Sequence, residues 1–241
     1  MRLDNRAPEE ARELTITPDF TTQAEGSVLI ETGKTKVICT ASVNDHVPVF
    51  LKGTGTGWVS AEYAMLPGST SSRIKRERGQ VGGRTHEIQR LIGRSLRSVV
   101  DFKALGERMI WIDCDVIQAD GGTRTASITG GYVALVLALR HLQKTKGPLF
   151  DVFPVQHQVA GISLGIFENQ VYLDLNYAED SQADVDMNVI MTDNRDIIEV
   201  QGTAEKASFS RSMLNQMLDL AEIGLNTHFA KQLNVLGGKV V

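Results

Sequence analysis

The chain has 241 residues, of which 42% are hydrophobic and 22% are charged. These values are ordinary for a globular protein and exclude a disordered, collagen-like or coiled-coil chain. The net charge of -4 excludes a protein that coats nucleic acids nonspecifically, so a polyanionic partner has to meet a local basic surface.

The cysteines and the first residues indicate the compartment. Cys39 and Cys114 are far apart in the sequence and have no second thiol beside them, so we expect neither a disulfide framework nor a zinc ribbon. The first six residues, MRLDNR, lack the apolar core of a signal peptide, and the longest uncharged apolar run, residues 132–139, is too short to span a bilayer. We therefore expect a soluble cytoplasmic protein without a membrane partner.

Short strands are predicted first along the chain. Residues 27–31 and 35–43 are strands joined by a Thr-Gly-Lys turn, and a further strand lies near residues 58–65. This alternation of strands and turns is typical of antiparallel hairpins. The glycine-rich residues 53–57 lack the flanking strand and helix of a dinucleotide site, so we assign them no cofactor role.

Two helices of different character are predicted next. Apolar residues within residues 85–102 follow the spacing of one helix face, with arginines on the opposite face. Residues 109–118 form a predicted strand. Residues 127–142 are hydrophobic nearly all round, which predicts a central buried helix, and Gly130 and Gly131 indicate close packing against a neighbour.

The rest of the chain repeats the order of strands and then a helix. Strands are predicted at residues 158–167, 171–176, 185–192 and 197–202, before an amphipathic helix capped by Ser210. We therefore predict an α+β fold in which mixed sheets pack on helices. It forms a single domain over residues 1–241 whose halves, residues 1–145 and 155–241, are related by a weak internal duplication.

Charge is divided unevenly between the halves. Residues 73–97 hold eight basic and two acidic residues, whereas residues 168–205 hold ten acidic residues and one arginine. A solvated face explains any one of these charges taken singly. Together, the two opposite clusters in one domain favour a polyanion site and a divalent-cation site.

The clearest chemical motif is DGGTRTAS at residues 120–127, between a predicted strand and the buried helix. Gly121 and Gly122 allow successive backbone N–H groups to turn toward one point, and a helix N-terminus adds positive potential. The alternative is an ordinary turn before a helix capped by one of the threonines. Arg124 favours an anion site, because an arginine in the first turn opposes the helix dipole unless an anion compensates it.

A similar unit, GGRT at residues 82–85, brings Arg84 to another predicted helix start behind two glycines. Taken alone, this unit is better explained as an ordinary loop that leads into a helix. Two such units in one chain are harder to dismiss, so Arg84 is a second candidate for anion binding.

The acidic segment at residues 179–188 is a candidate cation site. Asp184, Asp186 and Asn188 share one face of a predicted strand, and Asp180 on the preceding loop can fold back beside them. Hard oxygen ligands of this kind suit Mg²⁺ or Mn²⁺. The alternative is an ordinary acidic turn, which has the same composition.

Together, these motifs resemble those of the ribonuclease PH family. The segments that carry the resemblance are QVGGRT at residues 80–85, DCDVIQADGGTRTAS at residues 113–127, EDS at residues 179–181 and DMNV at residues 186–189. The resemblance covers essentially the whole chain. It implies a phosphate-dependent 3′→5′ exoribonuclease that trims RNA 3′ ends, especially those of tRNA precursors and also rRNA. Such an enzyme releases nucleoside diphosphates, catalyses the reverse nucleotidyl transfer, and forms a hexameric ring as a trimer of dimers.

The same resemblance implies roles for individual residues. Arg84 is similar to the family's phosphate-binding arginine, and Gly122, Thr123 and Arg124 are similar to its phosphate-binding loop. Inorganic phosphate is then the co-substrate and the nucleophile, which agrees with the absence of any recognisable nucleophile motif in the chain. Arg124 is also a candidate catalytic residue because it would orient the attacking phosphate.

Asp180 and Asp186 have the six-residue separation of the catalytic, metal-associated aspartates in related polynucleotide phosphorylases. This likeness implies Mg²⁺ or Mn²⁺ as the cofactor, and proton transfer to the leaving 3′-oxygen is the alternative role of either carboxyl group. Those relatives carry a lysine where this chain has Asn188, so the role of that lysine is not transferred.

The basic segment is the predicted RNA contact. Arg73, Arg76 and Arg78 lie in a loop flanked by serine and glycine, and we expect this loop to be mobile without ligand and to contact RNA phosphates. Two other functions remain open at this point. One is a non-catalytic RNA-binding subunit of a ring, and the other is a hydrolytic metal-dependent nuclease, against which the phosphate loop argues.

Overall fold

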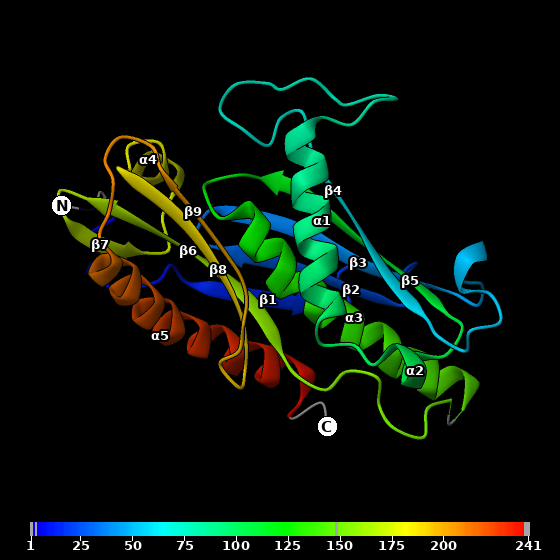
Figure 1. Ribbon diagram of the computed structural model, residues 1–241. Coiled ribbons are helices and arrows are strands. Elements are labelled where there is room, and N and C mark those ends of the chain that lie inside the picture. Colours follow the sequence, from blue (N-terminus) through cyan, green and yellow to red (C-terminus); the bar gives the residue numbers. More distant parts are fainter. Residues whose placement is uncertain (1, 3, 148, 239–241) are drawn as a thin grey trace.

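A computed structural model describes residues 2, 4–147 and 149–238, which form two β-sheets with helices packed against them (Figure 1). This arrangement confirms the predicted α+β class. The first sheet has the order β1-β2-β3-β5-β4 and the second the order β7-β6-β8-β9. The strands are β1 (Leu14–Pro18), β2 (Gly26–Thr32), β3 (Thr35–Asn44), β4 (Trp58–Met65), β5 (Met109–Gln118), β6 (Val159–Phe167), β7 (Gln170–Leu173), β8 (Val185–Thr192) and β9 (Ile197–Ala204). The helices are η1 (Val49–Leu51), α1 (Gly83–Arg97), α2 (Phe102–Leu105), α3 (Thr123–Lys146), α4 (Tyr177–Asp180) and α5 (Arg211–Leu236).

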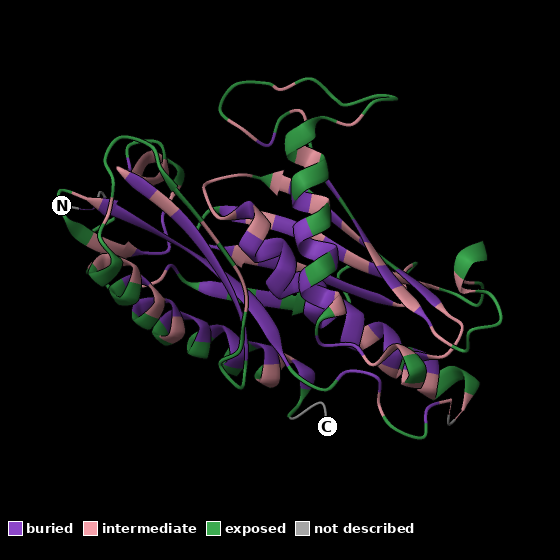
Figure 2. Cartoon of the chain, viewed as in Figure 1, coloured by how far each residue is buried: buried purple, intermediate pink, exposed green. Residues whose placement is uncertain are grey.

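Helix α3 is the centre of the fold. It packs on β2 and β3 of the first sheet and also against β6 of the second, so it is buried on nearly every side, as its sequence predicts (Figure 2). A Cβ atom added to Gly130 would lie 2.8 Å from the Ile30 side chain, and one added to Gly131 would lie 3.2 Å from Ile112. These distances confirm the predicted close packing and explain why the helix can approach the first sheet closely.

The first sheet contains one pairing that differs from the sequence prediction. β2 and β3 form the expected antiparallel hairpin, with Gly33 of its turn at a φ of 56°. β4 does not extend this hairpin pattern, because it pairs in parallel with β5. A parallel pair needs a crossover connection, and α1 supplies it by returning the chain across the sheet.

Several element boundaries also differ. The helix predicted over residues 85–102 ends at Arg97, and α2 then begins behind Asp101, whose carboxylate accepts the backbone N–H groups of the first turn. The strand predicted over residues 171–176 ends at Leu173, because Asn176 instead caps the short helix α4. β1 is an additional strand that the sequence prediction omitted.

The second sheet has its own core. Its inner face packs against α5, and the buried side chains between them form a cluster separate from the one around α3. The hydroxyl of Ser210 accepts a hydrogen bond of 3.2 Å from the backbone N–H of Met213, which confirms the predicted cap. Among the described helices, none is long and apolar enough to cross a membrane.

The two cysteines are distant in sequence but adjacent in space. Cys39 on β3 and Cys114 on β5 are direct cross-strand partners, and both are buried free thiols. The pairing of β3 with β5 thus places the two thiols opposite each other, a proximity that their separation in the sequence does not predict.

Candidate active site

The loop between β5 and α3 depends on two consecutive glycines. Gly121 has a φ of 77° and Gly122 a φ of 64°, both in the left-handed region that side chains disfavour. A Cβ atom added to Gly121 would also lie only 2.5 Å from the carbonyl oxygen of Leu175. Glycine is therefore required here both for the backbone conformation and for the space.

The buried ion pair of Arg12 and Asp174 supports this loop through a hydrogen bond to its backbone. The guanidinium of Arg12 lies 2.6 Å from the Asp174 carboxylate and donates a hydrogen bond of 2.5 Å to the backbone carbonyl of Asp120. Burial alone would raise the pKa of Asp174, but the positive charge of Arg12 lowers it, so the pair stays ionised. On the other side of the loop, the Thr35 hydroxyl donates to the carbonyl of Gly121 at 2.7 Å.

The start of α3 is open to an anion. Its N-cap is Gly122, and no side chain in the described part of the chain caps the helix there. The Thr125 hydroxyl donates to the Gly122 carbonyl at 2.9 Å, and the Thr123 hydroxyl shares a 2.9 Å hydrogen bond with the Tyr63 hydroxyl. Capping by a threonine, the alternative considered for this motif, is therefore not observed. The first-turn N–H groups of α3 are left without a side-chain acceptor.

Arg124, in that first turn, is held by two neighbouring elements. Its Nη1 atom donates to Gln201 on β9 at 3.0 Å and to Glu87 on α1 at 3.4 Å. Glu87 lies one turn beyond Arg84 at the start of the same helix. The structure thus places the starts of α1 and α3, which carry the two predicted phosphate-binding arginines, next to each other.

Arg84 and Arg124 act electrostatically on the same two groups, Tyr63 and Asp180. Burial raises the pKa of Tyr63, and the positive charges of Arg84 and Arg124 both oppose that rise. Burial likewise raises the pKa of Asp180, and the same two arginines act in the opposite direction. Two guanidinium groups that act on the same phenol and the same carboxyl group lie on one side of the molecule.

Asp180 and Asp186 form a carboxyl pair. Asp180 ends α4, Asp186 lies near the start of β8, and the two side chains are close enough to share a hydrogen bond. Burial and the negative charge of Asp180 raise the pKa of Asp186 to about 6. Two adjacent carboxylates repel each other, so their oxygen atoms fit a divalent cation that draws its other ligands from substrate phosphates and water. In the described ranges, no group of three or more His, Cys, Asp or Glu side chains is placed to hold a metal ion.

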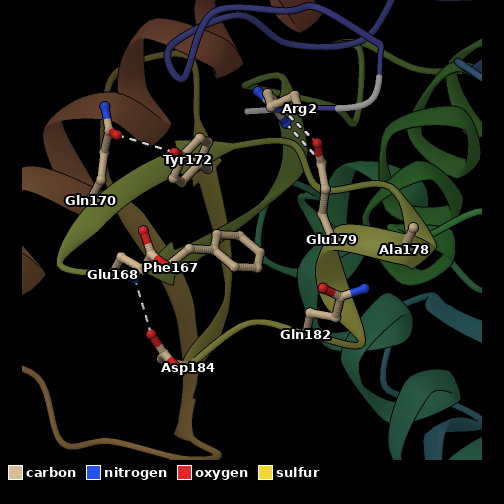
Figure 3. A pocket seen from close by; sticks show the side chains of 9 residues that line it. All are labelled: Arg2, Phe167, Glu168, Gln170, Tyr172, Ala178, Glu179, Gln182 and Asp184. Atoms are coloured by element: carbon tan, nitrogen blue, oxygen red, sulfur yellow. Dashed lines mark hydrogen bonds and ion pairs between the residues drawn. The ribbon is translucent and has the colours of Figure 1, made fainter.

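Asp186 and Asn188 lie two residues apart on β8 and share one face, as the strand pattern predicts, but Asp184 does not join the carboxyl pair. The Asp184 carboxylate accepts a hydrogen bond of 3.2 Å from the backbone N–H of Glu168, in the turn between β6 and β7, and Asn188 is buried within the second sheet. Asp184 instead lines a cavity of about 550 Å³ whose wall also includes Ala178 and Glu179 of α4 (Figure 3). Neither Asp180 nor Arg124 lines that cavity, so it is distinct from the carboxyl pair.

The chain is similar to known proteins over most of its length. Models of the 3′ exoribonuclease family match residues 10–140 as domain 1 and residues 157–224 as domain 2. A protein named ribonuclease PH from Bacillus cytotoxicus is 58% identical over 240 residues, which cover 98% of this chain and 97% of that protein. Another of the same name from Crocosphaera subtropica is 58% identical over 224 residues, covering 93% and 92% of the two chains. The chain belongs to the ribonuclease PH family.

The fold of this ribonuclease PH family member is also that of solved exosome subunits. A chain from the Archaeoglobus fulgidus exosome with RNA bound to the active site has a TM-score of 0.79 at 19% sequence identity, covering 95% of this chain and 92% of that chain. Rice Rrp46 has a TM-score of 0.73 at 21% identity, with 95% coverage of each chain. Likeness at these identities establishes the shared fold.

The basic loop of this family member lies between β4 and α1 and stands away from the sheets (Figure 1). Arg73, Arg76 and Arg78 are all exposed in it. The one acidic side chain among them, Glu77, accepts hydrogen bonds from the Gly82 N–H at 3.1 Å and from a hydroxyl at the start of α1. The loop is therefore tied to the same helix start that carries Arg84.

Four residues that shape the site are absent from the sequence prediction. They are Arg12, which supports the glycine loop, Tyr63, which contacts Thr123, and Glu87 and Gln201, which hold Arg124. Each comes from an element distant in sequence from the residue that it contacts. No local motif marks them, because their contacts exist only after the sheets have assembled.

Proposed function

We propose that this protein is a phosphate-dependent 3′→5′ exoribonuclease and nucleotidyltransferase that acts on RNA 3′ ends, especially those of tRNA precursors and also rRNA. The observation that carries this proposal is the position of Arg124 at the uncapped start of α3, directly after the Gly121-Gly122 turn. From there its positive charge acts on both carboxyl groups of the Asp180 and Asp186 pair. Membership of the ribonuclease PH family supports the same activity.

The chemistry that this site has to perform is the approach of two anions. At ~4 Å and an effective dielectric constant near 20, two unit charges repel by ~4 kcal/mol, so a phosphate dianion facing a phosphodiester monoanion costs roughly 8 kcal/mol. Arg84, Arg124 and the first N–H groups of α3 offset this repulsion and orient the phosphate. An oxygen of inorganic phosphate attacks the phosphorus that joins the 3′-terminal nucleotide to the chain, and the bond from that phosphorus to the 3′-oxygen of the penultimate nucleotide breaks. The products are a nucleoside diphosphate and a shortened RNA whose 3′-oxygen takes a proton.

The carboxyl pair supports a cofactor proposal. Asp180 and Asp186 would hold Mg²⁺ or Mn²⁺, and the bound cation would stabilise negative charge on the reacting phosphoryl group. The pKa of about 6 for Asp186 also supports the alternative that this carboxyl group donates the proton to the leaving 3′-oxygen.

One assay tests the proposed function. RNA labelled at its 3′ end is incubated with Mg²⁺, with and without inorganic phosphate, and the released mononucleotide is identified. We expect nucleoside diphosphates in the presence of phosphate only. Monophosphates formed without phosphate would indicate a hydrolytic nuclease instead, and the absence of any product would indicate a non-catalytic RNA-binding subunit.

Binding of RNA is expected to weaken as salt rises, because the exposed Arg73, Arg76 and Arg78 would contact phosphates and release condensed counterions. Affinity falls as salt rises, so the slope of log affinity against log salt concentration is negative, and replacing all three by glutamine should make it less negative by about 2 for single-stranded RNA. Fluorescence anisotropy of labelled RNA at several salt concentrations measures this slope. Binding that does not respond to salt would exclude the loop as an electrostatic RNA contact.

Membership of the family supports a proposal about assembly, to which we add a proposal about location that rests on the sequence alone. A homo-oligomer, specifically a hexamer built as a trimer of dimers, is the proposed state, and the cytoplasm is the proposed compartment. Val49 and Phe50, which are 91% and 71% exposed on η1, are large apolar side chains of the kind that subunit contacts cover.

A further inference from the structure

Gln201 on β9 connects three charged side chains through its single amide group. Its Oε1 atom accepts a hydrogen bond of 3.0 Å from Nη1 of Arg124. Its Nε2 atom donates to Glu199 at 3.0 Å and to Glu87 at 3.4 Å. β9 thus contributes a contact to the start of α3 from the opposite half of the chain.

The orientation of this amide is determined by its neighbours. Ionised carboxylates only accept hydrogen bonds, so the amide nitrogen of Gln201 has to face Glu199 and Glu87, and the amide oxygen then faces Arg124. Glu199 is itself held by Arg94, whose Nε donates to it at 2.7 Å. A flipped Gln201 amide would place its oxygen against carboxylate oxygens and its N–H groups against a guanidinium, which leaves both sides without a partner.

A neutral acceptor has a specific advantage next to Arg124. It orients the guanidinium without cancelling its positive charge, whereas a carboxylate at the same position would do both. Within the described residues, the side-chain hydrogen bonds of Arg124 all use Nη1. The Nε and Nη2 atoms lie on another edge of the planar group, and that edge matches the bidentate geometry by which arginine binds phosphate.

The Glu87 contact differs from the Gln201 contact. It is longer, at 3.4 Å, and the Glu87 side chain is 54% exposed, so solvent weakens this ion pair. Gln201 is thus the closer of the two groups that hold the guanidinium.

We propose that Gln201 is a positioning residue that holds Arg124 for bidentate contact with inorganic phosphate and preserves the charge that attracts it. This inference rests on the proposed function, since it specifies how the phosphate site of that function is organised.

Two variants test this role. Gln201→Met keeps the length of the side chain but removes all three hydrogen bonds of the amide, including the one to Arg124, and we expect phosphate affinity to fall about 10-fold, as for the loss of a hydrogen bond to a charged group. Gln201→Glu keeps the shape and adds a negative charge beside Arg124, and we expect a fall of about 100-fold. Calorimetric titration with inorganic phosphate measures both, and steady-state kinetics give the KM values for phosphate and for RNA. The KM for phosphate should rise in the same order while the KM for RNA stays unchanged.

The matched control is Gln170→Glu on β7, which makes the same chemical change on the surface. The Oε1 atom of Gln170 accepts a hydrogen bond from the Tyr172 hydroxyl, and a carboxylate accepts the same bond. This control should bind phosphate like the wild type. Thermal unfolding of each protein identifies variants that fail to fold, and Gln201→Glu, which preserves the side-chain shape, keeps the test available if Gln201→Met does not fold.

The outcomes separate this inference from the function on which it rests. If the wild type binds phosphate and both Gln201 variants bind it with the affinity of the wild type, the positioning role is overturned while the proposed function stands. If Gln201→Glu raises the KM for RNA as much as the KM for phosphate, the effect is structural and the positioning role is again overturned. If the wild type itself binds no phosphate, both the inference and the proposed function fail.

Discussion

Replacement of Arg124 by alanine is expected to lower kcat/KM for phosphate-dependent cleavage by about 1,000-fold, the upper range for removal of one preorganised charge-stabilising donor. Arg124 lies at the start of α3, where it adds a full positive charge to the unpaired N–H groups of the first turn. Its removal leaves the repulsion between phosphate and phosphodiester largely uncompensated. RNA affinity should change much less, because the exposed loop arginines lie on a different segment.

The measurement combines steady-state kinetics at several phosphate concentrations with RNA binding in the absence of phosphate. Arg195→Ala is a suitable control, because Arg195 pairs with Glu222 at 3.0 Å and is 70% exposed, so this variant removes an arginine away from the site. Equal losses of RNA binding and turnover in Arg124→Ala would contradict a specific role in orienting phosphate. Arg124→Lys should recover only part of the activity, because lysine keeps the charge but not the planar pair of donors.

Replacement of Asp186 by asparagine is expected to have opposite effects on activity and on stability. Activity should fall by about 100-fold or more under either proposed role, because an amide is neither a charged ligand for the cation nor a proton donor comparable to a carboxylic acid. Stability of the metal-free protein at pH 7 should rise. Burial and the charge of Asp180 raise the pKa of Asp186 from 3.8 to about 6, so ionised Asp186 is disfavoured in the folded state.

The sign of the pH dependence follows from this shift. Between pH 3.8 and about 6 the folded protein binds more protons at Asp186 than the unfolded chain does. The free energy of unfolding therefore falls as pH rises through that interval, and the loss is complete above it. Asp186→Asn removes the loss, and the expected gain at pH 7 is about 1–2 kcal/mol, less than the full shift at ~1.4 kcal/mol per pKa unit because solvent reaches the pair. Near pH 3.5 the two proteins should have similar stability.

Urea unfolding in the presence of a metal chelator at both pH values measures the stability effect. Asp219→Asn, on the exposed face of α5, is the matched control and should change neither activity nor the pH profile. An Asp186→Asn protein that is less stable than the wild type at pH 7 would show that the carboxylate is favourably held in the folded state, contrary to the repulsion inferred here.

The secondary structure was accessible to sequence analysis where the hydrophobic pattern was long. β5 has its predicted range, α5 begins at its predicted cap, and the buried character of α3 is evident from apolar residues on every side of the helix. The short β1 was missed because five residues carry too little pattern. The parallel pairing of β4 with β5 was also missed, since strand partners are chosen by packing of the whole sheet and the alternation of side chains is the same in both orientations.

The candidate site likewise has features that the sequence predicts and features that it does not. Its glycines, arginines and aspartates are recognisable because anion and cation binding require particular residue types in short local segments. Asp184 shows the limit of such reasoning, because the period of a strand places it beside Asp186 but the β6–β7 turn draws its carboxylate to the Glu168 N–H. The proximity of α1 and α3 could not be predicted either, because it depends on how both helices pack on the first sheet.

The amino-acid sequence specifies the chemical groups that are available, namely a glycine turn before a buried helix, arginines at two helix starts, and paired aspartates. These follow from local backbone and side-chain chemistry, which neighbouring residues specify. Which of these groups meet, and which residues support them, depends on the packing of the folded chain, as for Arg12 against the glycine loop and Gln201 against Arg124. Those contacts join residues 108 and 77 positions apart, because burial of two separate cores, rather than any local preference, brings such segments together.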